Sequence, residues 1–381
     1  MVNTATSTAD SELEFGRKIF RIGPKDRPFM LIGARTAVIT VSLWLATAVI
    51  AIFSLVDGSA SITGAEAFAA LTGNGDSYTN MIVVEWRAPR TLLAILLGAT
   101  LAMSGAIFQN LTANPLGSPD VIGFQTGSYT GALIVMLIIG GGSTQTLIGA
   151  LIGGITTALV VFFLASKRGF AGGVRLIIVG IAVSAMLASL NVWILLTASV
   201  EDAIMASLWG AGNLAGTSWN SLLLAVVGSA IFIVMAAFLA RPMRLMQIGI
   251  PFAVALGQNV RLVQILAVVA GIGLTALATA TAGPISFIAL AAPQIARRLV
   301  HVDGLALAPT AAVGSFLLIL ADTVAQRIDP ESPLPVGIVT VSIGGVYFLW
   351  LLIREGRRKS HVSWQIRPGL ETRTKSCAQE P

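Results

Sequence analysis

Charged residues and cysteine are both scarce in this 381-residue chain, and each shortage excludes a class of protein. Only 11% of the residues are charged, against about 25% in an ordinary soluble domain. By contrast, 55% are hydrophobic and the mean hydropathy is +0.84, so the apolar side chains cannot all fit inside a water-soluble globule. The single cysteine, Cys377, rules out an internal disulfide and leaves no basis for a thiolate zinc site.

The chain also lacks the residue patterns of an enzyme. The dipeptide Gly-Lys, which a P-loop needs to hold phosphates, does not occur. The only histidines, His301 and His361, are isolated, so we expect no nucleophile–histidine arrangement, no metal site and no cofactor. The chain therefore cannot hydrolyse ATP through a P-loop. The net charge of +6 does not indicate nucleic acid, because the basic residues stand at the ends of apolar runs.

The apolar residues gather in about ten segments of the length that a bilayer demands. We therefore predict an all-α, polytopic membrane protein whose first segment is an uncleaved helix, too long for a secretory signal. The eighth segment is short and begins at Gly283-Pro284, which predicts a broken or half-length helix. The predicted spans are 31–56, 91–109, 120–140, 145–166, 174–198, 219–240, 260–282, 285–300, 305–325 and 335–354.

The basic residues predict the orientation. With the N-terminus inside and ten alternating spans, 21 of the 24 Lys and Arg residues fall inside and 3 fall outside. The positive-inside rule therefore favours an N-in, C-in topology. The three outside residues, Arg87, Arg90 and Arg327, are exceptions to this rule.

Polar composition divides the chain into a membrane-spanning body, residues 30–356, and two tails, 1–29 and 357–381, which we expect to lie in the cytoplasm. The longest inside connection, 241–260, is semi-apolar and reads as a short helix at the cytoplasmic surface, either interfacial or available to a partner. Ionisable residues near the bilayer midplane, which ion-coupled transporters use, are rare here. Asp322 is the one candidate within a span, which disfavours a secondary transporter.

Four segments, in the same order, resemble the iron–siderophore and vitamin B12 permeases of ABC importers. They begin at Glu85, Ser104, Ala282 and Leu334 and contain Arg-Ala-Pro-Arg, Asn-Pro-Leu-Gly-Ser-Pro-Asp, Gly-Pro-Ile-Ser-Phe-Ile-Ala-Leu and Leu-Pro-Val-Gly. The resemblance covers about residues 35–356 and is strongest to the second permease subunit of ferric enterobactin importers. It implies the type II importer fold: ten helices per subunit, a second permease subunit (a related chain or a second copy), two cytoplasmic ATPases and an external substrate-binding protein.

The resemblance also implies roles for individual residues. Arg87, Arg90 and Arg327 match positions that contact acidic residues of the binding protein. Asn114 and Leu116 match the turn that narrows the inner end of the pathway. The segment with Gly249, Leu256 and Gly257 matches the helix that couples to the ATPase. Two departures stand out: Ile250-Pro251 replaces the usual acidic residues, and Gln294 replaces a usual histidine.

The composition predicts a multi-pass membrane protein with lipid around it and no role in nucleic-acid binding. The resemblance implies that it is a permease subunit in the cytoplasmic membrane that imports a catecholate ferric siderophore by alternating access. Two alternatives stay open. One is an importer of the same kind that carries haem or vitamin B12. The other is an ion-coupled secondary transporter that needs no ATPase.

Overall fold

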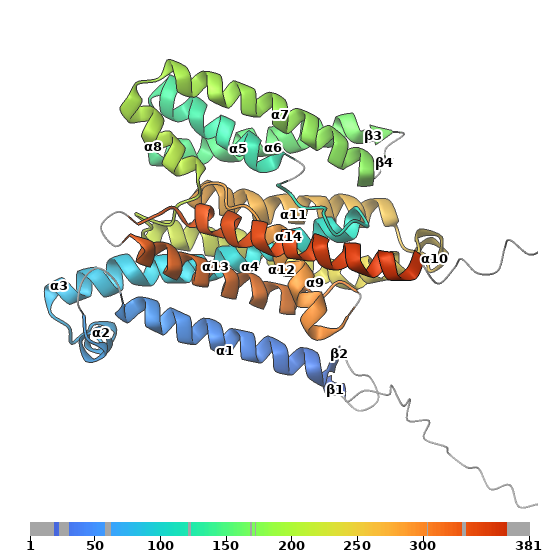
Figure 1. Ribbon diagram of the computed structural model, residues 1–381, viewed down its shortest axis with the longest axis horizontal. Helices are drawn as coiled ribbons and strands as arrows, with labels where there is room; N and C mark the ends of the chain where they lie inside the picture. Colours follow the sequence, from blue (N-terminus) through green and yellow to red (C-terminus); the bar gives the residue numbers. More distant parts are fainter. Residues whose placement is uncertain are drawn as a thin grey trace, which may run out of the picture.

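Long apolar runs become long helices in the computed structural model (Figure 1), which describes residues 19–22, 30–57, 62–120, 123–167, 170–171, 173–302, 304–329 and 333–363. A helix lies in each of the ten predicted ranges. The helices are α1 (Ala34–Val56), α2 (Gly64–Leu71), α3 (Ser77–Asn80), α4 (Ala88–Leu111), α5 (Phe124–Leu133), α6 (Ser143–Ala165), α7 (Gly173–Thr197), α8 (Val200–Gly210), α9 (Trp219–Ile248), α10 (Ile250–Ala255), α11 (Val260–Ala282), α12 (Ile288–Val300), α13 (Leu307–Ile328) and α14 (Val336–Ser363), with π-helical turns at Met81–Arg87 and Ile134–Ile139.

Seven helical runs in the described part of the chain are long and apolar enough to cross a membrane. They are Ala34–Val56, Ser77–Leu111, Ser143–Ala165, Arg175–Thr197, Trp219–Ile248, Val260–Ala282 and Leu307–Ile328. Two more apolar helices, Phe124–Ile139 and Val336–Tyr347, are shorter. Helix α12 has only 13 residues and follows a non-helical stretch in which Gly283 has φ +73°. The half-length helix expected after Gly283-Pro284 is therefore present.

The structure differs from the sequence-based expectation in three places. Helix α9 contains Pro242 in its interior and continues to Ile248, past the predicted end at 240. Helix α14 continues to Ser363, past the predicted start of the tail at 357. The fold is all-α as predicted except for two short antiparallel hairpins, in which β1 (Ile19–Ile22) pairs with β2 (Met30–Gly33) and β3 (Ser166–Lys167) pairs with β4 (Phe170–Ala171). Cys377 and most of both tails lie outside the described residues.

Helix α4 forms the centre of the bundle. Most of its residues are buried, whereas few residues of α1 and α7 are, as expected of helices that face lipid. Small residues let α4 approach α13 closely. A Cβ atom added to Gly98 would lie 2.3 Å from the carbonyl oxygen of Gly314, and one added to Gly314 would lie 2.2 Å from that of Gly98. Close backbone approach at small residues is the usual packing device of membrane helices.

In Figure 1 the bundle consists of a layer of α5, α6, α7 and α8 and a larger group that contains α4, α9, α11, α12 and α13. Helix α1 lies on the side of this group that is turned away from the layer. The two ends of the bundle also differ. Both hairpins and α10 lie at one end, which we call the α10 end (Figure 1, right), and α2, α3 and α8 lie at the other, which we call the α2 end. These ends carry the two groups of residues described next.

Candidate functional site

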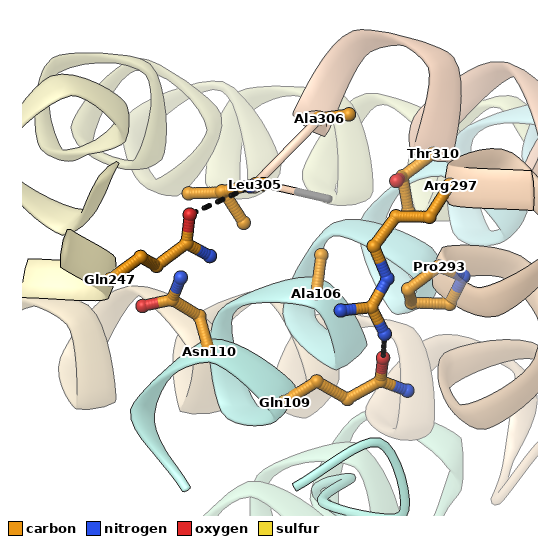
Figure 2. A pocket seen from close by; sticks show the side chains of 10 residues that line it. Ala106, Gln109, Asn110, Gln247, Pro293, Arg297, Leu305, Ala306 and Thr310 are labelled. Atoms are coloured by element: carbon orange, nitrogen blue, oxygen red, sulfur yellow. Dashed lines mark hydrogen bonds between the residues drawn. The ribbon is translucent and has the colours of Figure 1, made fainter. Parts of the chain in front are cut away.

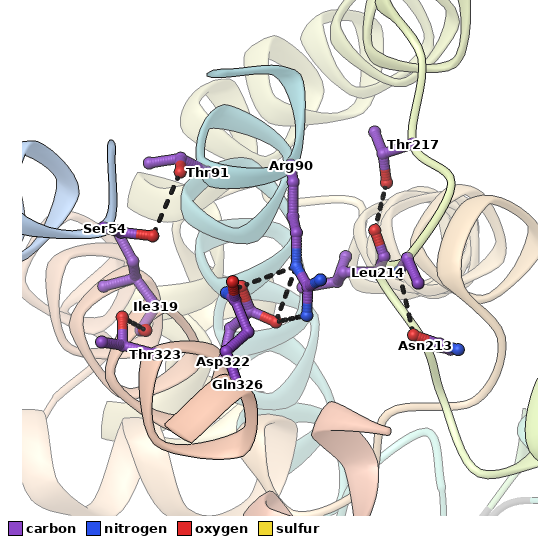
Figure 3. Close-up of polar contacts among 11 residues, drawn as sticks. Ser54, Arg90, Thr91, Asn213, Leu214, Thr217, Ile319, Asp322, Thr323 and Gln326 are labelled. Atoms are coloured by element: carbon purple, nitrogen blue, oxygen red, sulfur yellow. Dashed lines mark hydrogen bonds and ion pairs between the residues drawn. The ribbon is translucent and has the colours of Figure 1, made fainter. Parts of the chain in front are cut away.

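Arg90 and Asp322 form a largely buried ion pair between α4 and α13 near the α2 end (Figure 3). The Arg90 Nε donates to both carboxylate oxygens of Asp322 at 3.2 and 3.1 Å, and its Nη2 donates to Oδ1 at 2.8 Å. Gln326 Nε2 donates to Oδ2 at 2.8 Å. The side chains are 15% and 2% exposed. The one carboxylate that the sequence placed within a span is thus fully engaged by an arginine and an amide.

Arg87 and Arg327 both contact the last turn of α1. Arg87 Nη1 donates to the carbonyl oxygens of Leu55 and Val56 at 3.0 and 2.9 Å, two acceptors that the end of a helix leaves without an intrahelical partner. Arg327 Nε donates to Asp57 at 2.9 Å, and its guanidinium lies 4.4 Å above the Phe53 ring. These contacts connect the end of α1 to the π-helical turn that precedes α4 and to α13.

The three arginines therefore lie at the same end of the bundle, which a shared role in contacting the binding protein would require. Each of them, however, has a partner within the chain. Arg327 is the most accessible: its side chain is 50% exposed and that of Asp57 is 43% exposed. No local sequence pattern indicates these partners. Asp57 carries one signal in hindsight, because it is a carboxylate placed directly after a long apolar run.

A short turn at the α10 end contains Asn114 and Leu116. It follows α4, and Asn114 Oδ1 accepts the amide proton of Leu116 at 2.9 Å, which is an Asx turn. The amide of Gly117 donates to the carbonyl of Asn114 at 3.0 Å, and Ala113 has φ +48°. The Asn114 side chain thus shapes the turn, while the Leu116 side chain remains 44% exposed.

Helix α10 presents apolar side chains at the same end. It is bounded by two glycines with positive φ, Gly249 at +150° and Gly257 at +79°. Gln258 Nε2 donates to the carbonyl of Pro242 at 3.1 Å and holds the exit of α10 against α9. The large apolar side chains on and beside α10 are exposed: Ile248, Ile250, Phe252, Val254 and Leu256.

Within the described residues, no group of three or more His, Cys, Asp and Glu side chains could hold a metal ion. The described structure instead presents arginines at the α2 end of the bundle and exposed apolar side chains at the α10 end, with closely packed helices between the two ends.

Residues 46–354 match the FecCD transport family. The chain belongs to this family. The FecCD match contains six of the seven long apolar helical runs in full and the second half of the first, Ala34–Val56. It also includes the three arginines at the α2 end and the turn with Asn114.

Three relatives of this chain are named as permease proteins of ferric siderophore or hemin transport. The chain is 45% identical to the ferric enterobactin transport system permease protein FepG of Escherichia coli, over 87% of this chain and 100% of that protein. It is 34% identical to the iron(3+)-hydroxamate import system permease protein FhuG of Bacillus subtilis, over 74% and 86%. It is also 34% identical to the hemin transport system permease protein HmuU of Yersinia pestis, over 72% and 84%.

A solved structure supports the FecCD fold. The chain superposes on an inward-facing metal-chelate type ABC transporter with a TM-score of 0.73 and 25% identity, over 84% of this chain and 99% of that one. The helical architecture is therefore that of an ABC transporter permease.

Proposed function

We propose that this FecCD chain is the transmembrane permease subunit of an ABC importer that carries a catecholate ferric siderophore across the cytoplasmic membrane. The observation that carries the proposal is the 45% identity to FepG over the whole length of that protein. Haem is the second candidate cargo, since HmuU is also a relative, but at 34% identity.

The proposed topology has ten spans with both termini in the cytoplasm. It is supported by a helix in each predicted range and by the position of α10 at the end of the bundle where α1 begins. In this topology the α10 end faces the cytoplasm and the α2 end faces outward. The partners are a second, related permease subunit, two ATPases at the α10 end and a substrate-binding protein at the α2 end.

The proposed mechanism needs no covalent chemistry from this chain. The binding protein delivers the loaded siderophore at the α2 end. ATP hydrolysis in the partner subunits moves α10 and shifts an equilibrium between outward- and inward-open states. The turn with Asn114 and Leu116 closes the inner end of the pathway until that shift occurs.

Transport in proteoliposomes tests the proposal. The complete importer is expected to take up ferric enterobactin only with ATP and binding protein, and an excess of haem or vitamin B12 should not compete. A variant of the ATPase partner without its P-loop lysine serves as the control and should abolish uptake. Uptake driven by a proton gradient alone would instead establish a secondary transporter, and competition by haem would reassign the cargo.

Arg327 provides the sharpest test of the docking role proposed for Arg87, Arg90 and Arg327. Its guanidinium is half exposed, so an acidic partner can reach it, whereas reversal of Arg90 would first break a buried ion pair. We expect Arg327→Glu to slow association of the binding protein about tenfold at low salt, because rim charges act mainly on association rates. Raising the salt concentration should shrink the difference between wild type and variant.

Two further variants make that binding experiment specific. Asp57→Asn removes the carboxylate that now pairs with Arg327, and it should leave association unchanged or faster. Arg175→Glu reverses an exposed arginine that hydrogen-bonds to Leu164 at the opposite end, and it should have no effect. Equal association rates for wild type and Arg327→Glu at low salt would remove Arg327 from the docking surface.

A further inference from the structure

Gln294 connects α12 to the turn at the α10 end. Its Nε2 donates to the carbonyl oxygen of Pro115 at 2.8 Å and to Gln109 Oε1 at 3.2 Å. A glutamine amide carries two donor hydrogens, so both are used. Pro115 lies between Asn114 and Leu116, and the bond therefore holds the backbone of the turn itself.

Gln109 extends this connection to α4 and to a second part of α12. Its Oε1 also accepts from Arg297 Nη2 at 2.7 Å, as Figure 2 shows, and its Nε2 donates to the carbonyl of Leu290 at 3.0 Å. The side chain is only 3% exposed. Gln109 is thus fixed by α12 at two points and presents its oxygen as a rigid acceptor for Gln294. A hydrogen bond from the charged Arg297 is stronger than one between neutral groups.

The turn keeps its shape through hydrogen bonds that do not involve α12. Its own hydrogen bonds join Asn114 to Leu116 and to Gly117, so its shape does not depend on α12. What Gln294 supplies is the position of the turn relative to α12. If this one amide released Pro115, the turn would still be held to the end of α4, where the amide of Asn114 donates to the carbonyl of Gln109 at 3.2 Å, but it would be free to move relative to α12 without loss of the Asx turn.

We propose that Gln294 is the positioning residue of the inner gate: supported by Gln109 and Arg297, it latches the Asn114–Leu116 turn to α12 and keeps the pathway closed between transport cycles. The inference rests on the proposed function, in which this turn narrows the pathway. It also gives a role to the position where the family usually carries a histidine. An amide is uncharged at all pH values, so the latch does not depend on protonation of residue 294.

A distance measurement tests the latch without any transport. Cys377, the only cysteine, is replaced by serine, and nitroxide labels are placed at Leu116→Cys on the turn and Leu299→Cys on α12, both on exposed side chains. Electron paramagnetic resonance should give a narrow distance distribution in the otherwise native chain. Gln294→Met keeps the volume but removes both donors, so it should broaden the distribution. Gln294→His restores one ring N–H donor and should narrow it again.

Leakage tests the gate. Proteoliposomes of the complete importer are loaded with ferric enterobactin, and efflux is followed without ATP. Gln294→Met should raise efflux about fivefold, the effect of losing one net hydrogen bond, and Gln294→His should lower it again. Gln145→Met is the matched control, because Gln145 lies at the α2 end and accepts only from the amide of Gly142 in the described hydrogen bonds.

The two measurements separate the possible failures. An unchanged distance distribution in Gln294→Met overturns the latch, whatever the transport result. A broader distribution with unchanged efflux overturns its role in the gate. If the wild-type importer does not carry ferric enterobactin, the proposed function fails, and the distance measurement still decides whether Gln294 positions the turn.

Discussion

Replacement of Asp322 by alanine is expected to destabilise the chain by about 3–5 kcal/mol, the cost of breaking a buried ion pair by removal of one partner. The remaining Arg90 guanidinium is only 15% exposed, so water cannot replace the lost carboxylate. Gln326 would lose its acceptor as well. Thermal unfolding of the purified protein in nanodiscs measures the effect.

Two control variants isolate the buried charge as the cause. Asp57→Ala breaks the other described ion pair of the α2 end, which is about half exposed, and should cost at most about 1 kcal/mol. The double variant Arg90→Leu/Asp322→Leu leaves no unpaired charge and should recover most of the stability. If Asp322→Ala and Asp57→Ala unfold at the same temperature, the pair contributes no more than a surface contact.

Leu256→Asp is expected to lower the affinity of the permease for its ATPase about 30-fold or more, so that the ATPase no longer co-purifies with it. Leu256 is the C-cap residue of α10 and is 59% exposed, and replacement of an interface hot spot costs about 2 kcal/mol or more. Co-purification of the ATPase with the tagged permease measures the loss. Because apolar Ile250 and Pro251 stand where acidic residues are usual, retention by the wild type should change little between low and high salt.

Leu71→Asp is the matched control for that experiment. Leu71 is 51% exposed on α2, at the opposite end of the bundle, and its replacement places the same charge far from α10. ATPase retention should equal that of the wild type. Equal retention by Leu256→Asp would show that α10 is not the coupling surface.

The long helices were predictable because the bilayer sets their length and hydrophobicity, two properties that each segment carries by itself. The short α12 was predictable for the same reason, since Gly283 and Pro284 act locally. The structure shows this local effect: Gly283 adopts φ +73°, and α12 begins five residues later.

The contacts of the candidate site were not predictable in the same way. Arg90 and Asp322 are 232 positions apart, and no local pattern pairs them. The same holds for Gln294 and Pro115, which are 179 positions apart. The family resemblance selected the three arginines and the turn, but it carries no information on which groups of this chain they contact. The hairpin β1–β2 was missed because its polar surroundings resemble a tail, and short strands pair without a strong sequence signal.

The pairing of Arg90 with Asp322 also has a consequence for how the protein is made. A ribosome adds roughly 5–20 residues per second, so Asp322 is synthesised about 10–50 s after Arg90. Throughout that interval α4 has no α13 to pack against, and an unpaired arginine inside a membrane is costly. Arg90 lies in the first turn of α4, within reach of water at the α2 end, which lets its guanidinium stay hydrated during the wait. Burial of this charge, and the closing of Gly98 onto Gly314, are therefore late events in biogenesis that come only after the ninth of the ten proposed spans has been inserted.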